Sequence, residues 1–242
     1  MDCAPQIRGG LMAALNGWWD DYFWGAVVVL EVFMVALVMA VAFGLIGSAA
    51  KLSKNRLAKA IAAAYTVVFR GTPELLVLLI IYFGSAVTLT SIAQAVNPEI
   101  RFVDIPPFWA GAFAIALVVG AYMTETFRGA FLGVDVGQVE AARALGISSL
   151  QTFFYVRMPQ MWRLALPNFG NHMLSLMKDT ALISVVGLEE IVFVAEMATT
   201  VTVKPFTMYA FVAAIYLAIT SVITLSVFAL EKYANKHLED AR

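Results

Sequence analysis

Six charged side chains lie inside long apolar stretches of this sequence, where they are the residues best placed to do chemistry. They are Glu31, Arg70, Glu74, Glu125, Lys178 and Asp179. A charge at the centre of a hydrocarbon layer costs about 2.5–3.5 kcal/mol on insertion scales, so each of the six is a candidate for a functional site. Their chemistry suits the binding of a charged solute, because a carboxylate pairs with a cation and a lysine or arginine pairs with an anion.

Arg70 and Glu74 are four residues apart, a spacing at which two side chains on one helix face each other. Pro73 lies between them and weakens a helix locally, because proline lacks the backbone N–H that a helix needs. Two interpretations stay open. Either the two charges neutralise each other beside a kink, or Glu74 lines a translocation cavity.

Glu125 and Lys178 also allow two interpretations each. Glu125 lies near Tyr122 and could bind the side chain of a cationic solute, or it could pair with Arg128. Lys178 could bind a carboxylate of the solute, or it could neutralise the adjacent Asp179. The candidate residues of a solute pathway are Arg70, Thr72, Glu74, Tyr122, Glu125 and Lys178.

The sequence contains no pattern typical of catalysis or of a metal site. No nucleophile stands beside a base at a plausible spacing, and His172 has no second histidine at metal-ligand spacing. None of the sixteen glycines is followed by lysine, so the chain has no phosphate-binding P-loop. We therefore expect a protein that is not an enzyme and that holds no metal or cofactor of its own.

The composition predicts an all-α integral membrane protein. Of the 242 residues, 61% are hydrophobic and 14% are charged, whereas about a quarter of a soluble domain is charged. Apolar runs reach the ~20 residues that a helix needs to cross the hydrocarbon core. We expect one transmembrane domain over 1–242 with five spans, at 23–50, 58–92, 108–127, 166–187 and 206–230. The net charge of −1 gives no reason to expect nucleic acid as a partner.

Lysine and arginine are distributed unequally between the two sides of these spans. Eleven lie in the segments on one side: Lys51, Lys54, Arg56, Lys59, Arg128, Arg143, Arg157, Arg163, Lys232, Lys236 and Arg242. Three lie on the other side: Arg8, Arg101 and Lys204. Because cytoplasmic loops carry the excess of positive charge, this distribution predicts an outside N-terminus and a cytoplasmic C-terminus, which requires an odd number of spans.

Residues 134–159 are mixed in polarity and lie on the side with more positive charge. They contain two pairs that resemble helix N-caps with reciprocal partners: Asp135 with Gln138 and Ser148 with Gln151. Gly146 suits the left-handed residue that ends a first helix, and Pro159 is expected to end a second one. The pattern predicts a hairpin of two short helices at the cytoplasmic membrane surface, which would form a docking surface.

Five residues of this segment are spaced as in a known loop: Glu140, Ala141, Ala142, Gly146 and Pro159. The spacing resembles the EAA loop of importer permeases of the ATP-binding-cassette class. Val156 and Met158 stand where that family usually has Ile and Leu, and both changes keep an apolar side chain. The resemblance implies that the loop inserts into a groove on a cytoplasmic ATPase subunit and transmits its closing motion. The alternative is an amphipathic hairpin without a partner.

Residues 69–73, 120–130 and 163–167 resemble the polar amino-acid permeases of that class, and residues 50–56 and 124–131 resemble the branch for histidine, lysine-arginine-ornithine and opines. The resemblance implies a permease subunit of the bacterial inner membrane that translocates polar, preferentially basic, amino acids such as histidine, arginine, lysine, ornithine or opines. It implies as partners a second permease subunit, a paralogue rather than a copy of this chain, two ATPase subunits that bind ATP and Mg, and an extracytoplasmic solute-binding protein.

An ion-gradient-driven carrier or channel subunit is the main alternative. Such proteins tend to contain paired inverted repeats with broken helices, and no repeat is detectable in this sequence. The substrate also stays open, because neutral polar amino acids fit the resemblance. Glu189 and Glu190 are expected to be solvated or to meet the binding protein.

Overall fold

The computed structural model describes residues 17–239, and every regular element in that part of the chain is a helix. The all-α prediction is therefore confirmed, whereas Arg8 and Arg242, which entered the charge count, lie outside the described residues. In chain order the elements are α2 (Trp19–Leu52), α3 (Arg56–Gly71), α4 (Glu74–Val96), α5 (Pro107–Leu132), α6 (Val136–Ala144), α7 (Ser149–Thr152), the π-helical turn η1 (Phe153–Arg157), α8 (Met158–Asp179), the 3-10 helix η2 (Thr180–Val186), α9 (Ile191–Thr202) and α10 (Pro205–Glu239).

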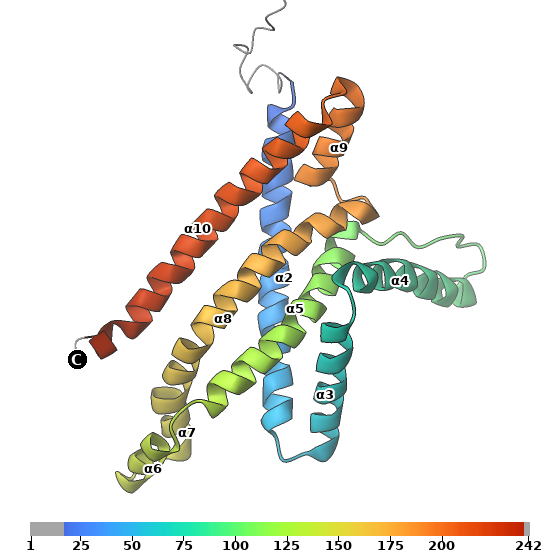
Figure 1. Cartoon of the computed structure of the whole chain (residues 1–242). Helices are drawn as coiled ribbons and strands as arrows, with labels where there is room; N and C mark the ends of the chain where they lie inside the picture. The colour runs from blue at the N-terminus through green and yellow to red at the C-terminus, as the bar shows by residue number, and fades with distance from the viewer. Residues whose placement is uncertain (1–16, 240–242) are drawn as a thin grey trace, which may run out of the picture.

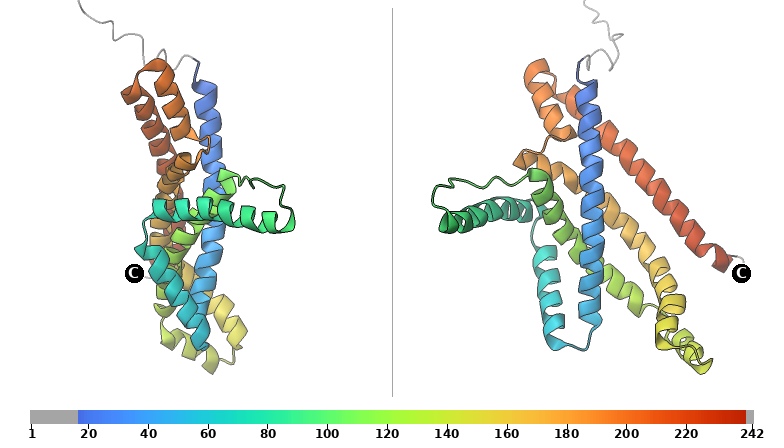
Figure 2. Two further views of the ribbon diagram at one scale, coloured as in Figure 1. Left: turned by 90° about the vertical axis from the view of Figure 1, so that its right-hand side faces the viewer. Right: turned by 180° about the vertical axis from the view of Figure 1, so that it is seen from behind.

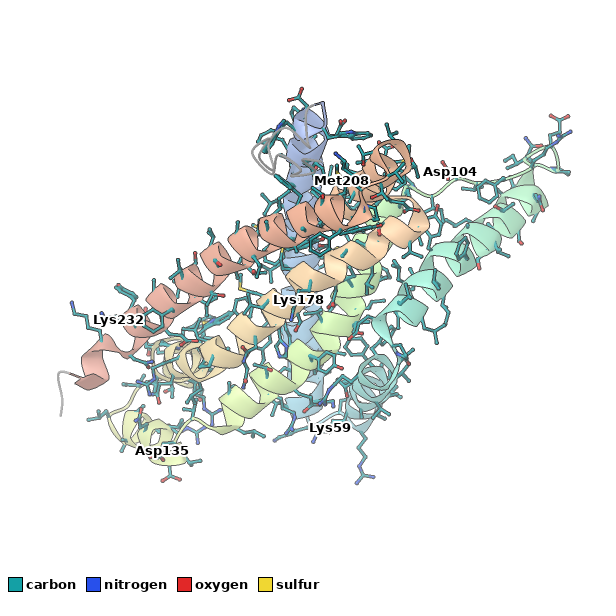
Figure 3. The ribbon with its side chains drawn as sticks, turned by 45° about the horizontal axis from the view of Figure 1, so that its top comes forward. Lys59, Asp104, Asp135, Lys178, Met208 and Lys232 are labelled. Atoms are coloured by element: carbon teal, nitrogen blue, oxygen red, sulfur yellow. The ribbon has the colours of Figure 1, made fainter. Side chains whose placement is uncertain are left out.

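The helices form an elongated body with two distinct ends (Figure 1). The turn between α2 and α3 lies at one end together with α6 and α7, whereas α9 and the start of α2 lie at the other. Figure 3 shows Lys59, Asp135 and Lys232 toward the first end, and Asp104 and Met208 toward the second. The segments that are rich in lysine and arginine are thus at the same end as α6 and α7.

The centre of the body is the packing of α2 along α5. Small residues allow the two backbones to approach closely, as is usual between membrane helices. A Cβ atom added at Gly44 would lie 2.7 Å from the Cβ of Met123, and one added at Gly120 would lie 2.7 Å from the Cβ of Phe43. Both positions therefore require glycine for steric reasons.

We expect Gly44→Val to destabilise the protein by about 1–3 kcal/mol, because the new side chain would separate α2 from α5. Thermal unfolding of the purified protein in detergent would measure the loss. The matched control is Gly84→Val on α4, where an added Cβ has no atom within 4 Å. An equal loss of stability in both variants would contradict the steric explanation, because the change in helix propensity is the same.

Four helices in the described part of the chain are long and apolar enough to cross a membrane: α2, α4, α5 and α10. They cover the predicted spans at 23–50, 108–127 and 206–230 and the second half of the one at 58–92. The structure does not place α8 in this group, and α8 contains only residues 166–179 of the predicted span at 166–187. The five-span topology therefore stays a prediction.

The stretch 58–92 was expected to form one span, and the structure corrects this to two helices. α3 ends at Gly71 and α4 begins at Glu74. Thr72 is extended, with φ −105° and ψ 135°, as favoured for a residue before proline, whose ring disfavours the helical region there. Arg70 and Glu74 consequently lie on different helices and do not face each other across one turn. Figure 2 shows α4 running across the direction of α2 and away from the body.

The hairpin and the fourth span also differ from expectation. Pro159 does not end a helix, since α7, η1 and α8 follow one another without a break from Ser149 to Asp179. The wide turn η1, in which the N–H of Met158 donates to the carbonyl of Phe153, accommodates the proline ring that a regular α-helical turn would exclude. Beyond Asp179 the chain tightens into the 3-10 helix η2.

Glu190 was expected to be solvated or to meet the binding protein, and it is instead fully buried. It is the N-cap of α9, where its carboxylate accepts hydrogen bonds from the N–H groups of Val192 (3.0 Å) and Phe193 (3.3 Å). The hydroxyl of Tyr216 on α10 also donates to it at 3.5 Å. The free N–H groups at a helix start can replace solvent around a carboxylate. Glu189, by contrast, is exposed as expected.

Candidate functional site

A cavity of about 350 Å³ lies between α4, α5 and α8. It falls within the size range of small-molecule sites, toward the small end. Its lining includes two apolar side chains, and the others are polar or charged: Glu74 from α4, Val118, Val119 and Tyr122 from α5, and Asn171, His172, Ser175 and Asp179 from α8. This is the composition expected of a site for a small polar solute.

The helical repeat explains why α8 presents four polar residues to the cavity. Asn171, Ser175 and Asp179 are separated by four residues each and so lie on one face of the helix. Leu176 and Met177, which point elsewhere, are fully buried in the apolar core. In the sequence these polar residues only weakened the prediction of a span at 166–187. Their spacing of four residues nevertheless already placed them on one face of a helix.

Two carboxylates, those of Glu74 and Asp179, face this cavity, and none of its lining residues is lysine or arginine. Both ion pairs in the described part of the chain involve another residue, Glu125. Lys178 is exposed, does not line the cavity and forms no ion pair with Asp179 in the described part of the chain, although its charge acts on that neighbouring carboxylate. The cavity therefore has an excess of negative charge, which favours a cationic solute.

One wall of the cavity is held by contacts between α5 and α8. The Nε2 atom of His172 lies 2.8 Å from the hydroxyl of Thr126, and its ring lies 6.0 Å from the ring of Tyr122. The hydroxyl of Tyr122 donates to the carbonyl of Arg70 at 3.3 Å. Tyr122 is thus fixed between the end of α3 and His172, as expected for a residue that shapes a site.

A second hollow, of about 480 Å³, adjoins the first through Tyr122. Its lining includes Lys51, Thr66, Arg70, Tyr122 and Glu125. The guanidinium carbon of Arg70 lies 5.3 Å from the centre of the Tyr122 ring, a cation–π distance. The six predicted pathway residues are therefore divided: Glu74 and Tyr122 line the first hollow, and Arg70, Tyr122 and Glu125 line the second.

The remaining two candidates line neither hollow. The hydroxyl of Thr72 donates to the carbonyl of Val68 at 2.8 Å and so closes the end of its own helix. Lys178 faces outward, and Figure 3 labels it on α8 between the two ends of the body. The role of these two residues in a solute pathway therefore stays a prediction.

Glu125 is held by two cations. Its carboxylate forms ion pairs with Lys51 and with Arg128, the second at 2.9 Å. Lys51 also donates to the hydroxyl of Thr66 at 2.6 Å, so the cluster joins α2, α3 and α5. The structure thus contains the pairing with Arg128 that was one of the two interpretations of Glu125. Nothing in the sequence indicated the contact between Lys51 and Glu125, because Lys51 was assigned to a loop.

The segment 134–159 contains most of the local features that its sequence predicts. Asp135 caps α6 by accepting from the N–H of Gly137 at 2.8 Å, and Ser148 forms a complete capping box with Gln151. Gly146 is left-handed, with φ 77°. Its N–H donates to the carbonyl of Arg143, and the N–H of Ile147 donates to that of Ala142, which together form a Schellman motif. Gln138 was wrongly paired with Asp135; its side chain contacts Gln160 instead.

This segment exposes much of its surface. Glu140, Ala141, Gly146 and Pro159 are exposed, whereas Ala142 is buried. The same segment leaves several large apolar side chains exposed, with relative exposures of 80% for Leu145, 70% for Leu150 and 78% for Tyr155. Clustered apolar exposure of this kind marks a surface that another protein or a membrane covers.

Residues 40–239 match the family described as the binding-protein-dependent transport system inner membrane component. The chain belongs to this family. The match includes both hollows and the segment 134–159. The predicted resemblance to importer permeases is therefore confirmed, and the protein is a permease of that family.

Relatives of this permease are found in several bacteria. It is 41% identical to the histidine/lysine/arginine/ornithine transport system permease protein HisQ of Escherichia coli, over 82% of this chain and 86% of that protein. It is 38% identical to the octopine transport system permease protein OccQ of Rhizobium radiobacter, over 86% and 87%. The structure of an amino acid ABC transporter with histidines matches with a TM-score of 0.79 at 30% identity, covering 93% of this chain and 98% of that one.

Proposed function

We propose that this permease is the transmembrane subunit of an ATP-driven importer that translocates basic amino acids or opines. The observation that carries the proposal is the cavity between α4, α5 and α8, whose lining includes the carboxylates of Glu74 and Asp179 and no lysine or arginine; within the described residues neither carboxylate forms an ion pair. Relatives at about 40% identity are permeases of systems for histidine, lysine, arginine and ornithine and for octopine. All of these solutes carry a cationic or protonatable side chain.

The permease crosses the bacterial inner membrane five times, with its N-terminus outside and its C-terminus in the cytoplasm. α8 is the additional crossing besides the four apolar helices. Its polar face is compatible with a membrane because that face lines a cavity rather than lipid. The basic turn between α2 and α3 lies at the same end as α6 and α7 (Figure 1), which agrees with a cytoplasmic location for both.

Two exposed surfaces correspond to two kinds of partner. The segment 134–159 docks on one of two cytoplasmic ATPase subunits, which bind ATP and Mg. α4 packs against a second permease subunit, a paralogue of this chain, and this contact covers its exposed apolar side chains: Leu75, Leu76, Ile80, Phe83, Val87, Leu89, Ile92 and Val96. An extracytoplasmic solute-binding protein delivers the amino acid to the opposite end of the molecule, where α9 lies.

The helical continuity from Ser149 to Asp179 suggests how force reaches the solute. A helix transmits displacement along its axis because its hydrogen bonds run in that direction. When the ATPase subunits close and move α6 and α7, the motion passes through η1 into α8 and displaces Asp179 relative to Glu74 on α4. The cavity then opens to the other side of the membrane. No covalent chemistry takes place in this chain.

The importer and the ion-gradient-driven carrier predict different results on purification. Expressed with the genes that neighbour its own, the permease should co-purify in detergent with an ATPase subunit, and arginine uptake into vesicles should require internal ATP. A matched sample that lacks the ATPase should show no uptake. Uptake by the permease alone, driven by a proton or sodium gradient, would overturn the importer assignment and favour the carrier.

A further inference from the structure

An apolar groove between α2 and α3 lies apart from both hollows and has no role in the proposed transport. Its volume is about 460 Å³, and its walls include Phe43, Ile46 and Ala50 from α2 and Ala58, Ile61 and Tyr65 from α3. The hydroxyl of Tyr65 donates to the carbonyl of Leu117 at 2.7 Å. The ring alone therefore faces the groove, whose surface suits a hydrocarbon chain.

A basic turn adjoins one end of this groove. Ala50 and Ala58 are at this end, and the chain that joins them carries Lys54 and Arg56, with Lys59 immediately beyond. All three cations are exposed, and within residues 17–239 none of them forms an ion pair. The sequence from 32 to 73 contains no Asp or Glu. These charges therefore lack an acidic neighbour along the chain.

Hydrogen bonds between side chains and the backbone hold the turn between α2 and α3. The side chain of Asn55 caps α3 by accepting from the N–H groups of Leu57 (2.9 Å) and Ala58 (3.3 Å). The hydroxyl of Ser53 donates to the carbonyl of Ala50 at 2.8 Å and so closes the end of α2. The three cations are thus presented by a short, hydrogen-bonded turn. Lys51, the fourth cation of this region, is already paired with Glu125.

We propose that the groove and the basic turn together form a binding site for an anionic phospholipid. One acyl chain occupies the groove between α2 and α3, and the phosphate headgroup lies at Lys54, Arg56 and Lys59. A phospholipid combines a long hydrocarbon with an anion at one end, and the site combines an apolar groove with cations at one end. Basic pockets between membrane helices on the cytoplasmic side bind anionic headgroups in this way. Figure 3 shows Lys59 at this end of the body.

Native mass spectrometry of the delipidated full-length permease can test the headgroup half of the site. Phosphatidylglycerol and phosphatidylcholine with identical acyl chains are titrated separately, and the lipids retained on each chain are counted. Phosphatidylglycerol should bind at a lower concentration than phosphatidylcholine, and Lys54→Gln combined with Lys59→Gln should weaken its binding by about thirtyfold. The control, Lys232→Gln with Lys236→Gln, removes two exposed cations of α10 and should have no effect. Equal binding of the two lipids, or an equal loss in the control, would overturn the proposal.

A second variant tests the groove itself. Ala58→Phe places a ring where the acyl chain would lie, at a half-buried position that can accept a larger side chain. It should reduce retention of phosphatidylglycerol while the melting temperature and elution volume stay as in the wild type. Undiminished retention of phosphatidylglycerol would refute the proposed position of the acyl chain. The same holds if Ala58→Phe changes the number of permease chains per particle and leaves the number of bound lipids unchanged. The test does not depend on which amino acid the permease transports.

Discussion

Gly146→Val should reduce transport by about tenfold and leave the amount of permease in the membrane unchanged. Gly146 is left-handed, with φ 77°, a conformation that costs an L-residue about 1–2 kcal/mol and is worst for β-branched side chains. A Cβ at this position has no atom within 4 Å, so a new side chain meets no neighbour. The cost is therefore backbone strain in the turn between α6 and α7. Uptake of labelled arginine and solute-stimulated ATPase activity of the whole complex would measure the effect.

Gly146→Asn is the matched control, because asparagine tolerates the left-handed conformation. It should retain most of the transport activity, although its side chain is similar in size to that of valine. Normal uptake by Gly146→Val at normal abundance would contradict a role for this turn in coupling. Loss of the protein from the membrane in both variants would show instead that the turn is needed for folding.

We expect the second large effect on transport from neutralising the cavity carboxylates of Glu74 and Asp179. Asp179→Asn or Glu74→Gln removes a hydrogen bond to a charged group, which contributes about 1.5–3 kcal/mol, so each should raise the KM for arginine by roughly tenfold to a hundredfold. The double variant should abolish arginine uptake. Both changes preserve the shape of the side chain, which keeps the cavity at its present volume.

The ratio of arginine uptake to glutamine uptake separates a binding role from general damage. It should fall in the Asp179→Asn and Glu74→Gln variants, because glutamine has no cationic side chain to pair with these carboxylates. Glu189→Gln is the control, since it removes an exposed carboxylate outside the cavity and should leave the ratio unchanged. If both uptakes fell in proportion, the cavity would not be the site that recognises the side chain.

The sequence alone determined the features that depend on near neighbours in the chain. Apolar runs identified α2, α5 and α10. In the segment 134–159 the helix ends at Asp135, Gly146 and Ser148 followed from single residues, whereas the end expected at Pro159 was wrong. Ser148 with Gln151 and Gly146 act on groups within about four residues, so their effects can be predicted without a fold. The same holds for the loop spacing that indicated the importer permeases.

Only the tertiary structure decided which charges meet. Glu125 receives Lys51 from the end of α2, and the cavity brings Glu74 on α4 to Asp179 on α8. Pro73 signalled a break, but the direction that α4 takes after it depends on packing, as does the passage of the helix through Pro159. A charged group in an apolar environment pairs with whichever partner the packing of helices brings near, and that partner is set by contacts across the whole bundle rather than by spacing along the chain.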